Sequence, residues 1–469
     1  MVQSLATCAD APPRPHVVLV ASPGAGHLNP MAELARRLVA RLGLAATLVT
    51  FAGLSAAGPD AHAAAALSSL RDAGVATAVL PAVPLDDLPP GARAETALFE
   101  LIARSVPRLR ALLRDIGAAA PLAALVPDLF AAAVLPLAAE LGVPGYLFYP
   151  ASLYVLSFMR RAVELNDGAA PGEYRDLPDA LRLPGGVSLR REDYADGFRS
   201  SEEPMEPGNV EELRQAAEQG TFPPAYPVGP LIRPSSDEDA ASPCIQWLDR
   251  QPTGSVVYIS FGSAGALSVE QMAELAAGLE DSGHRFLWAV RMPSLDGENS
   301  DLGKTCTDDG SDPVAWLPEG FLDRTSRRGL AVASWAPQVR VLSHPATAVF
   351  VSHCGWNSTL ESVASGVPMV AWPLHAEQRT NAAVLSESVG VALRPRAARA
   401  DGLIGREEVA AAVRELMEGE KGRAVRRRTG DLRQAADAAW APEGASRRAM
   451  EEVAGRWKAA ALGGRARGA

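Results

Sequence analysis

The feature that most constrains the fold of this chain is a short apolar run followed by a glycine-containing loop and an amphipathic segment. Residues His16–Ala21 predict a buried strand, and the loop Ser22–His27 carries two glycines. Across Leu28–Leu42, leucine and methionine recur every three or four residues, which predicts a helix with one apolar face. Ala45–Phe51 is a second apolar run. This order predicts a βαβ unit and therefore a parallel sheet.

The same order returns in the second half of the chain. Ser255–Phe261 predicts a strand, and Ser268 is placed to begin a helix, with Gln271 completing a capping box. Arg285–Val290 predicts the returning strand, and Thr347–Ser352 predicts a further strand that leads into another helix. We therefore predict an α/β protein with a parallel sheet in each half.

A chain of 469 residues is too long for one ordinary core and suits two domains. The segment Arg233–Pro243 is polar and flanked by prolines, as expected of a linker. We expect an N-terminal domain over residues 1–232 and a C-terminal domain over residues 244–445. A helix over residues 446–469 is expected to pack back on the N-terminal domain.

Composition excludes several classes of function. The formal net charge of −10 argues against an extended nucleic-acid or anionic-membrane footprint.

The apolar stretch Ile116–Pro150 is interrupted by Asp128 and several prolines, which favours buried strand and helix over a membrane span. The first fourteen residues lack an apolar core, so we expect no secretory signal and a cytoplasmic location. The four cysteines are far apart and predict neither a disulfide scaffold nor a zinc knuckle.

The segment Trp335–Gln378 concentrates groups that can bind a nucleotide sugar. The strand Thr347–Ser352 delivers His353–Ser358 to the start of a helix, where free N–H groups and the positive end of the helix dipole suit a diphosphate. Glu361, one turn further, can accept hydrogen bonds from a ribose diol. The indole of Trp335 offers a flat face for a base. For Trp372, a position in the core is as good an interpretation as a place in the site.

His27 and Asp128 are the second candidate site. His27 directly follows the Pro-Gly-x-Gly loop at a helix start, where the positive helix end disfavours imidazolium and leaves a neutral ring able to take a proton. Asp128 carries the only charge between Asp115 and Glu140, and a buried carboxylate needs a partner. Asp128 is therefore expected to have a partner, and a helix cap is one alternative.

The 44 residues from Trp335 to Gln378 resemble, without a gap, the signature box of the plant family 1 glycosyltransferases that modify secondary metabolites. The resemblance implies two facing Rossmann-like domains, the GT-B fold, and a UDP-sugar donor. Uracil would stack on Trp335, and the sugar would be bound by Glu377 and Gln378. The donor-binding residues that the resemblance implies are Ser22, Ser263, Trp335, Ala336, Gln338, His353, Gly355, Trp356, Asn357, Ser358, Glu361, Glu377 and Gln378.

The implied reaction is an inverting transfer of glucose from UDP-glucose to a hydroxyl group, with His27 as general base oriented by Asp128 and no metal ion. Residues 21–30 (ASPGAGHLNP), 126–130 (VPDLF) and 376–378 (AEQ) look most like the group that acts on simple phenols such as hydroquinone and monolignols. We expect a monomer without a nucleic-acid partner or a transmembrane segment. The expected acceptor-binding residues are Glu95, Leu129, Phe130, Phe148 and Tyr149.

The resemblance breaks between Leu189 and Phe222. Relatives place a helix and an apolar strand there, whereas this stretch contains no run of four apolar residues. We predict that the N-terminal sheet lacks one helix–strand step of about 30 residues. An impaired variant that binds UDP-sugar without turning it over is therefore the alternative function. A Rossmann oxidoreductase is disfavoured, because Asn29 replaces the third glycine of the dinucleotide-binding motif.

Overall fold

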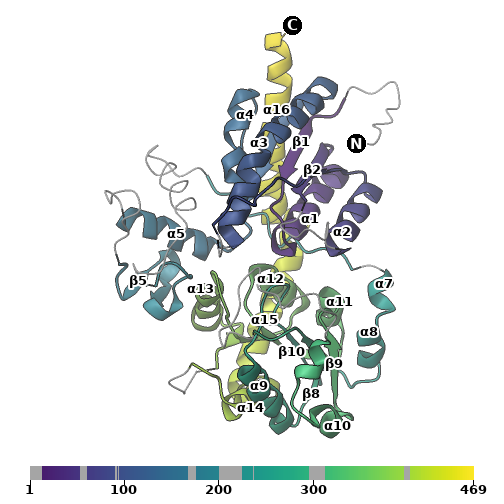
Figure 1. Ribbon diagram of the computed structural model, residues 1–469, viewed down its shortest axis with the longest axis vertical. Helices are drawn as coiled ribbons and strands as arrows, with labels where there is room; N and C mark the ends of the chain where they lie inside the picture. The colour runs from purple at the N-terminus through teal and green to yellow at the C-terminus, as the bar shows by residue number, and fades with distance from the viewer. Residues whose placement is uncertain are drawn as a thin grey trace. The chain divides into compact units, whose positions relative to one another are not determined.

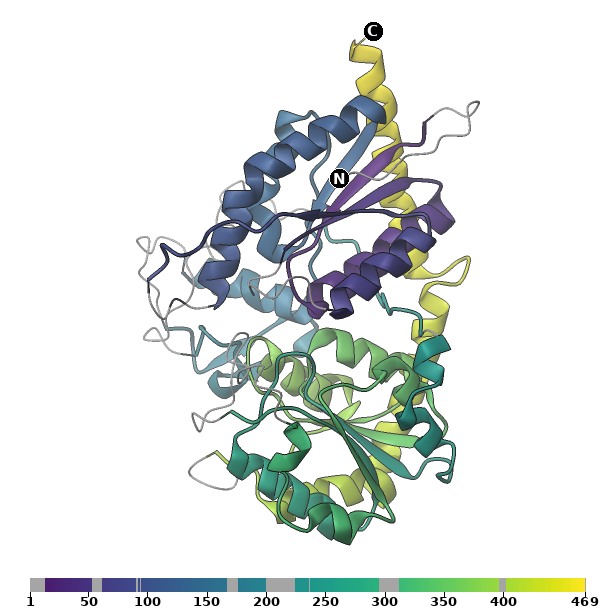
Figure 2. The ribbon, with the colours of Figure 1, turned by 45° about the vertical axis from the view of Figure 1, so that its right-hand side comes forward.

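The chain forms two compact units, each an α/β layer structure around its own parallel sheet (Figures 1 and 2). Unit 1 comprises Met1–Pro150, Phe222–Arg233 and Ala439–Ala469, and unit 2 comprises Ala151–Thr221 and Pro234–Ala438. The predicted α/β class with parallel sheets is confirmed. The computed structural model describes residues 13–52, 61–89, 92, 94–166, 176–199, 224–235, 237–294, 312–395 and 402–468.

The sheet of unit 1 has the order β3-β2-β1-β4 and is parallel throughout. Its core strand β1 (His16–Val20) is buried on both faces: Val17 and Leu19 join one apolar cluster, and Val18 and Val20 join the other. This explains the continuous apolar run in the sequence. The other strands are β2 (Ala45–Phe51), β3 (Ala76–Leu80) and β4 (Leu122–Pro127).

Helices cover both faces of this sheet. The predicted first helix is α1 (Ala25–Leu42). The C-terminal helix α16 (Ala445–Gly468) packs against β4 and α1, and its buried Trp457 meets the ring of Tyr146 edge-on. The remaining helices are α2 (Ala61–Asp72), α3 (Ala94–Ala119), the 3-10 helix η1 (Leu129–Val134) and α4 (Pro136–Glu140).

The sheet of unit 2 has the order β12-β11-β10-β7-β8-β9 and is also parallel. All of its strands therefore end at the same edge, which is where ligands bind in open α/β sheets. Its strands are β7 (Val256–Ser260), β8 (Arg285–Val290), β9 (Gly329–Ala333), β10 (Thr347–Ser352), β11 (Met369–Ala371) and β12 (Ala392–Leu393).

Helices surround this sheet as well. They are α7 (Asp237–Ala240), α8 (Pro243–Leu248), α9 (Val269–Ser282), η4 (Pro313–Trp316), α10 (Phe321–Thr325), α11 (Gln338–Ser343), α12 (Trp356–Ser365), α13 (Gln378–Ala383), the π-helix η5 (Val384–Val389), α14 (Arg406–Glu418) and α15 (Glu420–Ala439).

The capping box predicted at the start of α9 is only half formed. The hydroxyl of Ser268 accepts a hydrogen bond from the N–H of Gln271, as expected of a helix cap. The side chain of Gln271 does not complete the box. It donates to the carbonyl of Ile404 and accepts from the N–H of the same residue, and so ties α9 to the segment that precedes α14. A long-range partner has displaced the local one.

Residues 151–199 pack with unit 2, which differs from the predicted domain boundary at residue 232. Phe158, Leu189 and Tyr194 form one apolar cluster with Ala383 and Val384 of the segment that joins α13 to η5. The predicted loss of a helix–strand step concerns residues 190–221, most of which lie outside the described residues. The elements of this segment are α5 (Leu153–Leu165), β5 (Ala180–Arg182), η2 (Pro184–Gly186), β6 (Ser188–Arg190) and η3 (Arg191–Asp193).

Acid should destabilise unit 1 through His16 at the start of β1. Its ring shares a 2.7 Å hydrogen bond with Thr47 Oγ1, and burial lowers its pKa from 6.5 to about 4. The unfolded chain takes up this proton near pH 6.5, so the stabilisation is complete above that pH and is lost as the pH falls toward 4. We expect the contribution to shrink by about 2 kcal/mol between pH 7 and pH 5.

The measurement is urea unfolding at both pH values for the parent chain and His16→Gln, which keeps a hydrogen-bonding group but does not titrate. The loss between pH 7 and pH 5 should be smaller in the variant by the same amount. Equal losses in the two proteins would contradict the assignment to His16.

Candidate functional site

Unit 1 brings together the two residues that the sequence singled out as a catalytic pair. Asp128 lies just past the end of β4 and is fully buried. Its Oδ2 is 3.0 Å from Nδ1 of His27. A carboxylate only accepts hydrogen bonds, so the neutral ring of His27 carries its proton on Nδ1 and leaves Nε2 as an acceptor. The imidazole is 19% exposed, which leaves it accessible to a ligand.

Three further hydrogen bonds hold the carboxylate of Asp128. The N–H of Ser22 donates to Oδ2 at 2.8 Å, and the hydroxyl of Ser22 donates to Oδ1 at 2.6 Å. The N–H of Ala131 also donates to Oδ1, at 3.1 Å, so Asp128 is the N-cap of η1 as well. Asp128 therefore bonds to His27 and caps η1 at the same time, and its role in orienting a catalytic base stays a prediction.

The backbone at Gly24 makes the turn that brings His27 into place. Gly24 has φ 111°, a conformation that side chains resist, and it is the N-cap of α1. The turn places His27 in the first turn of α1, the helix that follows the buried strand β1. The fully buried Ser22 donates both its N–H and its hydroxyl to Asp128, and the phosphate contact implied for it stays a prediction.

The predicted acceptor residues differ in their relation to His27. The ring of Phe130 lies 4.7 Å from the imidazole, between centroids, and Phe99 meets Phe130 edge-on. The N–H of Phe148 donates to the carbonyl of Pro127, which ties its backbone to the end of β4. The side chains of Glu95, Leu129 and Tyr149 are partly buried, and their role stays a prediction.

In unit 2, three predicted donor residues follow the ends of β7, β9 and β10, at the same edge of the parallel sheet. Ser263 follows β7 and is exposed, Trp335 follows β9 and is 56% exposed, and His353 directly follows β10. An exposed indole at a strand end is available to stack on a base. Trp372 is instead 3% exposed and packs edge-on against Phe261, so the core interpretation of Trp372 is confirmed.

Several of the predicted donor-binding residues lie at or beside the start of α12. Trp356 and Asn357 open the helix after the cap residue Gly355. From α11, the side-chain amide of Gln338 donates to Ser358 Oγ at 2.8 Å and to Glu361 Oε2 at 2.7 Å. These hydrogen bonds join polar side chains of α11 and α12. Ala336, which precedes α11, is buried in the core and can act only through its backbone.

The ring of His353 fills the space between two glycines. A Cβ atom at Gly262 would lie 2.6 Å from this ring, and one at Gly355 would lie 2.4 Å from its Nε2. Both positions therefore require glycine. Burial lowers the pKa of His353 to about 3, so the ring is neutral at physiological pH.

Backbone strain concentrates in the same segment. Among the described residues, the non-glycine residues with positive φ are Ser334, Cys354 and Ala376. They directly precede Trp335, Gly355 and Glu377, all of which are predicted donor residues. Strained residues persist only where surrounding contacts hold them, and they cluster at functional sites. No residue pattern predicts this strain.

The start of α13 is linked to the same edge of the sheet. The side-chain oxygen of Gln378 accepts from the N–H groups of Leu374 and His375, at 2.9 and 3.1 Å, and the residue is 5% exposed. The side-chain amide of Asn381 donates to the carbonyl of Cys354 at 3.0 Å, which ties α13 to the loop before α12. We did not single out Asn381 from the sequence; its place one turn after Glu377 is the available signal.

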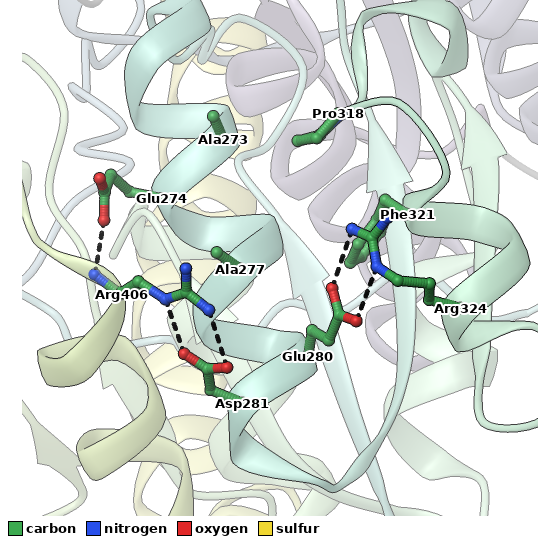
Figure 3. A pocket seen from close by; sticks show the side chains of 9 residues that line it. All are labelled: Ala273, Glu274, Ala277, Glu280, Asp281, Pro318, Phe321, Arg324 and Arg406. Carbon is green, nitrogen blue, oxygen red and sulfur yellow. Dashed lines mark hydrogen bonds and ion pairs between the residues drawn. The ribbon is translucent and has the colours of Figure 1, made fainter.

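A hollow of about 510 Å³ lies elsewhere on unit 2, between α9, α10 and α14 (Figure 3). Its charged groups pair with each other: Arg406 with Asp281, and Arg324 with Glu280. None of the predicted site residues lines it, so we do not regard it as the functional site. Within the described ranges there is no cluster of three or more metal-ligating side chains and no helix long and apolar enough to cross a membrane.

Comparison with known proteins decides the family. The family described as UDP-glucoronosyl and UDP-glucosyl transferase matches residues 235–426. Over 95% of this chain and 98% of the relative, the sequence is 42% identical to hydroquinone glucosyltransferase of Rauvolfia serpentina. It is 41% identical to UDP-glycosyltransferase 72B1 of Arabidopsis thaliana, over 95% of this chain and 96% of that one. The chain belongs to the plant family 1 UDP-glycosyltransferases.

The fold of this UDP-glycosyltransferase agrees with that assignment. UGT2 of Phytolacca americana, solved with UDP-2fluoro-glucose and pterostilbene, has a TM-score of 0.81 and 37% identity, covering 95% of this chain and 100% of that one. The family resemblance and the GT-B fold predicted from the sequence are thereby confirmed. The chain is an enzyme of the glycosyltransferase class.

Proposed function

We propose that this glycosyltransferase transfers glucose from UDP-glucose to a hydroxyl of a small phenol. The curated relative at 42% identity is a hydroquinone glucosyltransferase, and the Phytolacca structure contains a UDP-glucose analogue and the phenol pterostilbene. In this chain, the ring of Phe130 lies beside His27 and Phe99 meets Phe130 edge-on, which gives an aromatic surface that suits a planar acceptor.

The proposed reaction is one inverting displacement. Nε2 of His27 takes the proton of the phenol hydroxyl, and the phenol oxygen forms a bond to the anomeric carbon of glucose. The bond between that carbon and the diphosphate oxygen breaks, and UDP leaves with the electron pair. Asp128 stabilises the imidazolium that forms, because its carboxylate accepts the Nδ1 hydrogen bond.

The donor is proposed to bind at the carboxyl edge of the unit 2 sheet. Trp335 stacks on the uracil, and Gln338 and Glu361 recognise the ribose. Donors at the start of α12, with the positive end of its dipole, stabilise the charge on the departing diphosphate. The sugar hydroxyls are proposed to contact Glu377 and Gln378. The remaining proposed diphosphate contacts are Ser263, His353, Gly355, Trp356, Asn357 and Ser358.

The observation that carries the proposal is the 3.0 Å hydrogen bond between His27 and the fully buried Asp128. A base oriented in this way is required for transfer and is not required for binding UDP alone. The test is the rate of UDP release from UDP-glucose in the presence of a panel of phenols, with no phenol as the control. Tight UDP binding without phenol-dependent release would instead support the impaired UDP-sugar binder.

Ser22 should matter through Asp128. We propose that its hydroxyl fixes the rotamer of the carboxylate, since it donates to the oxygen that His27 does not use. Ser22→Ala should lower kcat about tenfold, because it removes one charge-assisted hydrogen bond while the backbone N–H of the residue remains. Affinity for UDP should stay within about twofold, as measured by calorimetry. A large loss of UDP affinity would favour the phosphate contact implied by the family resemblance.

A further inference from the structure

The turn that follows η3 contacts the loop that leads into α13, although the two are 180 residues apart. Oδ2 of Asp196 accepts a hydrogen bond of 2.7 Å from the N–H of Ala376. The N–H of Asp196 donates to the carbonyl of Ala376 at 3.1 Å. One residue therefore holds both polar groups of the Ala376 backbone.

Ala376 needs such support because of its conformation. It has φ 55°, in the left-handed region that the Cβ of an alanine disfavours. The conformation of Ala376 sets the direction in which the chain continues into Glu377 and Gln378. If Ala376 relaxed to an ordinary conformation, both of these side chains would be displaced. External hydrogen bonds are thus required to keep them in place.

The turn that carries Asp196 is itself fixed to α13. Thr380 Oγ1 donates to the carbonyl of Asp193 at 2.8 Å, and the buried carboxylate of Asp193 pairs with Arg394. The rings of Phe158 and Tyr194 pack nearby in the cluster that includes Ala383. Figure 1 shows α5 and β5, from the same chain segment, beside α13. These contacts therefore hold the turn that carries Asp196 in a fixed position against α13.

Charge also orients the carboxylate of Asp196. Its Oδ1 lies 3.5 Å from Nε of Arg379 and 3.5 Å from Nε of Arg199. Both arginines pair with Oδ1. The other carboxylate oxygen, Oδ2, therefore stays directed at the N–H of Ala376. Asp196 is about one third exposed, so its role depends on this geometry rather than on deep burial.

We propose that Asp196 is a positioning residue for the sugar half of the donor. It holds the Ala376 backbone so that Glu377 and Gln378 face the glucosyl hydroxyls, and it contacts no part of UDP. The inference rests on the proposed function, in which Glu377 and Gln378 bind the sugar. Under this proposal, residues 151–199, which precede the linker in the sequence, take part in recognising the sugar of the donor.

The test compares the affinities of UDP and UDP-glucose for three variants, measured by calorimetry. Asp196→Ala should weaken UDP-glucose binding about tenfold and raise its KM similarly, while UDP affinity stays within twofold. Asp196→Asn keeps an oxygen that can accept from the Ala376 N–H and should recover most of the loss. The matched control is Asp179→Ala, which removes an exposed carboxylate from the same segment that pairs only with Arg191 among the described ion pairs.

Hydrogen–deuterium exchange over residues 374–379 supplies a readout independent of turnover. The Ala376 amide should exchange faster in Asp196→Ala than in Asp196→Asn or the parent chain. Unchanged UDP-glucose affinity in Asp196→Ala, or an equal loss of UDP affinity, would overturn the positioning role. A parent chain that binds UDP-glucose but releases no UDP with any phenol would overturn the proposed function. The comparison of UDP and UDP-glucose affinities among the Asp196 variants would still test the positioning role. A parent chain that binds neither nucleotide would overturn both.

Discussion

His27→Ala is expected to slow sugar transfer about a thousandfold while leaving the affinity for UDP within twofold. General base catalysis contributes about 10² to 10⁴ in rate, and an unassisted phenol hydroxyl would have to lose its proton to water. The side chain of His27 is one fifth exposed and is held by Asp128 alone among its described hydrogen bonds. Its removal should therefore have little effect on folding. The measurement is UDP release at saturating UDP-glucose and phenol.

Asp128→Asn should produce a loss of similar size for a different reason. The amide can donate a hydrogen bond to Nδ1, which favours the tautomer with the proton on Nε2 and removes the acceptor that the reaction requires. His284→Ala is the matched control, because His284 has a similar exposure (16%) and a carboxylate partner, Glu418, yet lies outside both sites. Parallel losses of transfer and UDP affinity in His27→Ala would exclude its assignment as the base.

Gly355→Ala is expected to abolish measurable UDP binding. The new methyl group would lie 2.4 Å from Nε2 of His353, well inside van der Waals contact. The ring is buried and has no room on its other side, because it already lies where a Cβ of Gly262 would sit. The clash should be relieved by movement of the loop before α12, which carries the proposed diphosphate contacts. UDP affinity by calorimetry should fall at least about a hundredfold, since several charge-assisted hydrogen bonds are lost together.

Gly430→Ala supplies the comparison for this steric effect. Gly430 lies inside α15 in the same unit, and a Cβ there would meet nothing within 4 Å. Alanine is favoured over glycine in a helix by about 1 kcal/mol, so this variant should bind UDP normally and unfold at the same or a slightly higher temperature. Normal UDP affinity in a folded Gly355→Ala protein would show that the loop can adapt, contrary to our prediction.

Most of the secondary structure around the two sites was predictable because it depends on local patterns. The strands at residues 16–20 and 256–260 are buried on both faces, which produces an unbroken apolar run. The helix α1 has its apolar residues on one face, and Ser268 caps α9 through a hydrogen bond that spans three residues. The sequence also predicted that Asp128 has a partner, because an isolated carboxylate in an apolar stretch requires one, and the family resemblance implied that this partner is His27.

Interactions between distant residues were not predictable in the same way. Gln271 bonds to Ile404 rather than to its own helix start, and Asp196 bonds to Ala376, because both partners come close only after folding. The left-handed backbone at Ser334, Cys354 and Ala376 has no signature in residue type. It exists because surrounding hydrogen bonds hold it.

The sequence by itself therefore determined the two βαβ patterns, the continuous signature from Trp335 to Gln378 and the partnership of His27 with Asp128. The βαβ patterns follow from residue spacing, and the need of Asp128 for a partner follows from the cost of an unpaired buried charge. The signature and the choice of His27 as that partner rest on the resemblance to the family. Tertiary structure alone decided that residues 151–199 pack with unit 2 and that His353 occupies the space left by two glycines. Packing and long-range hydrogen bonds depend on which surfaces meet, and residue order along the chain does not encode this locally.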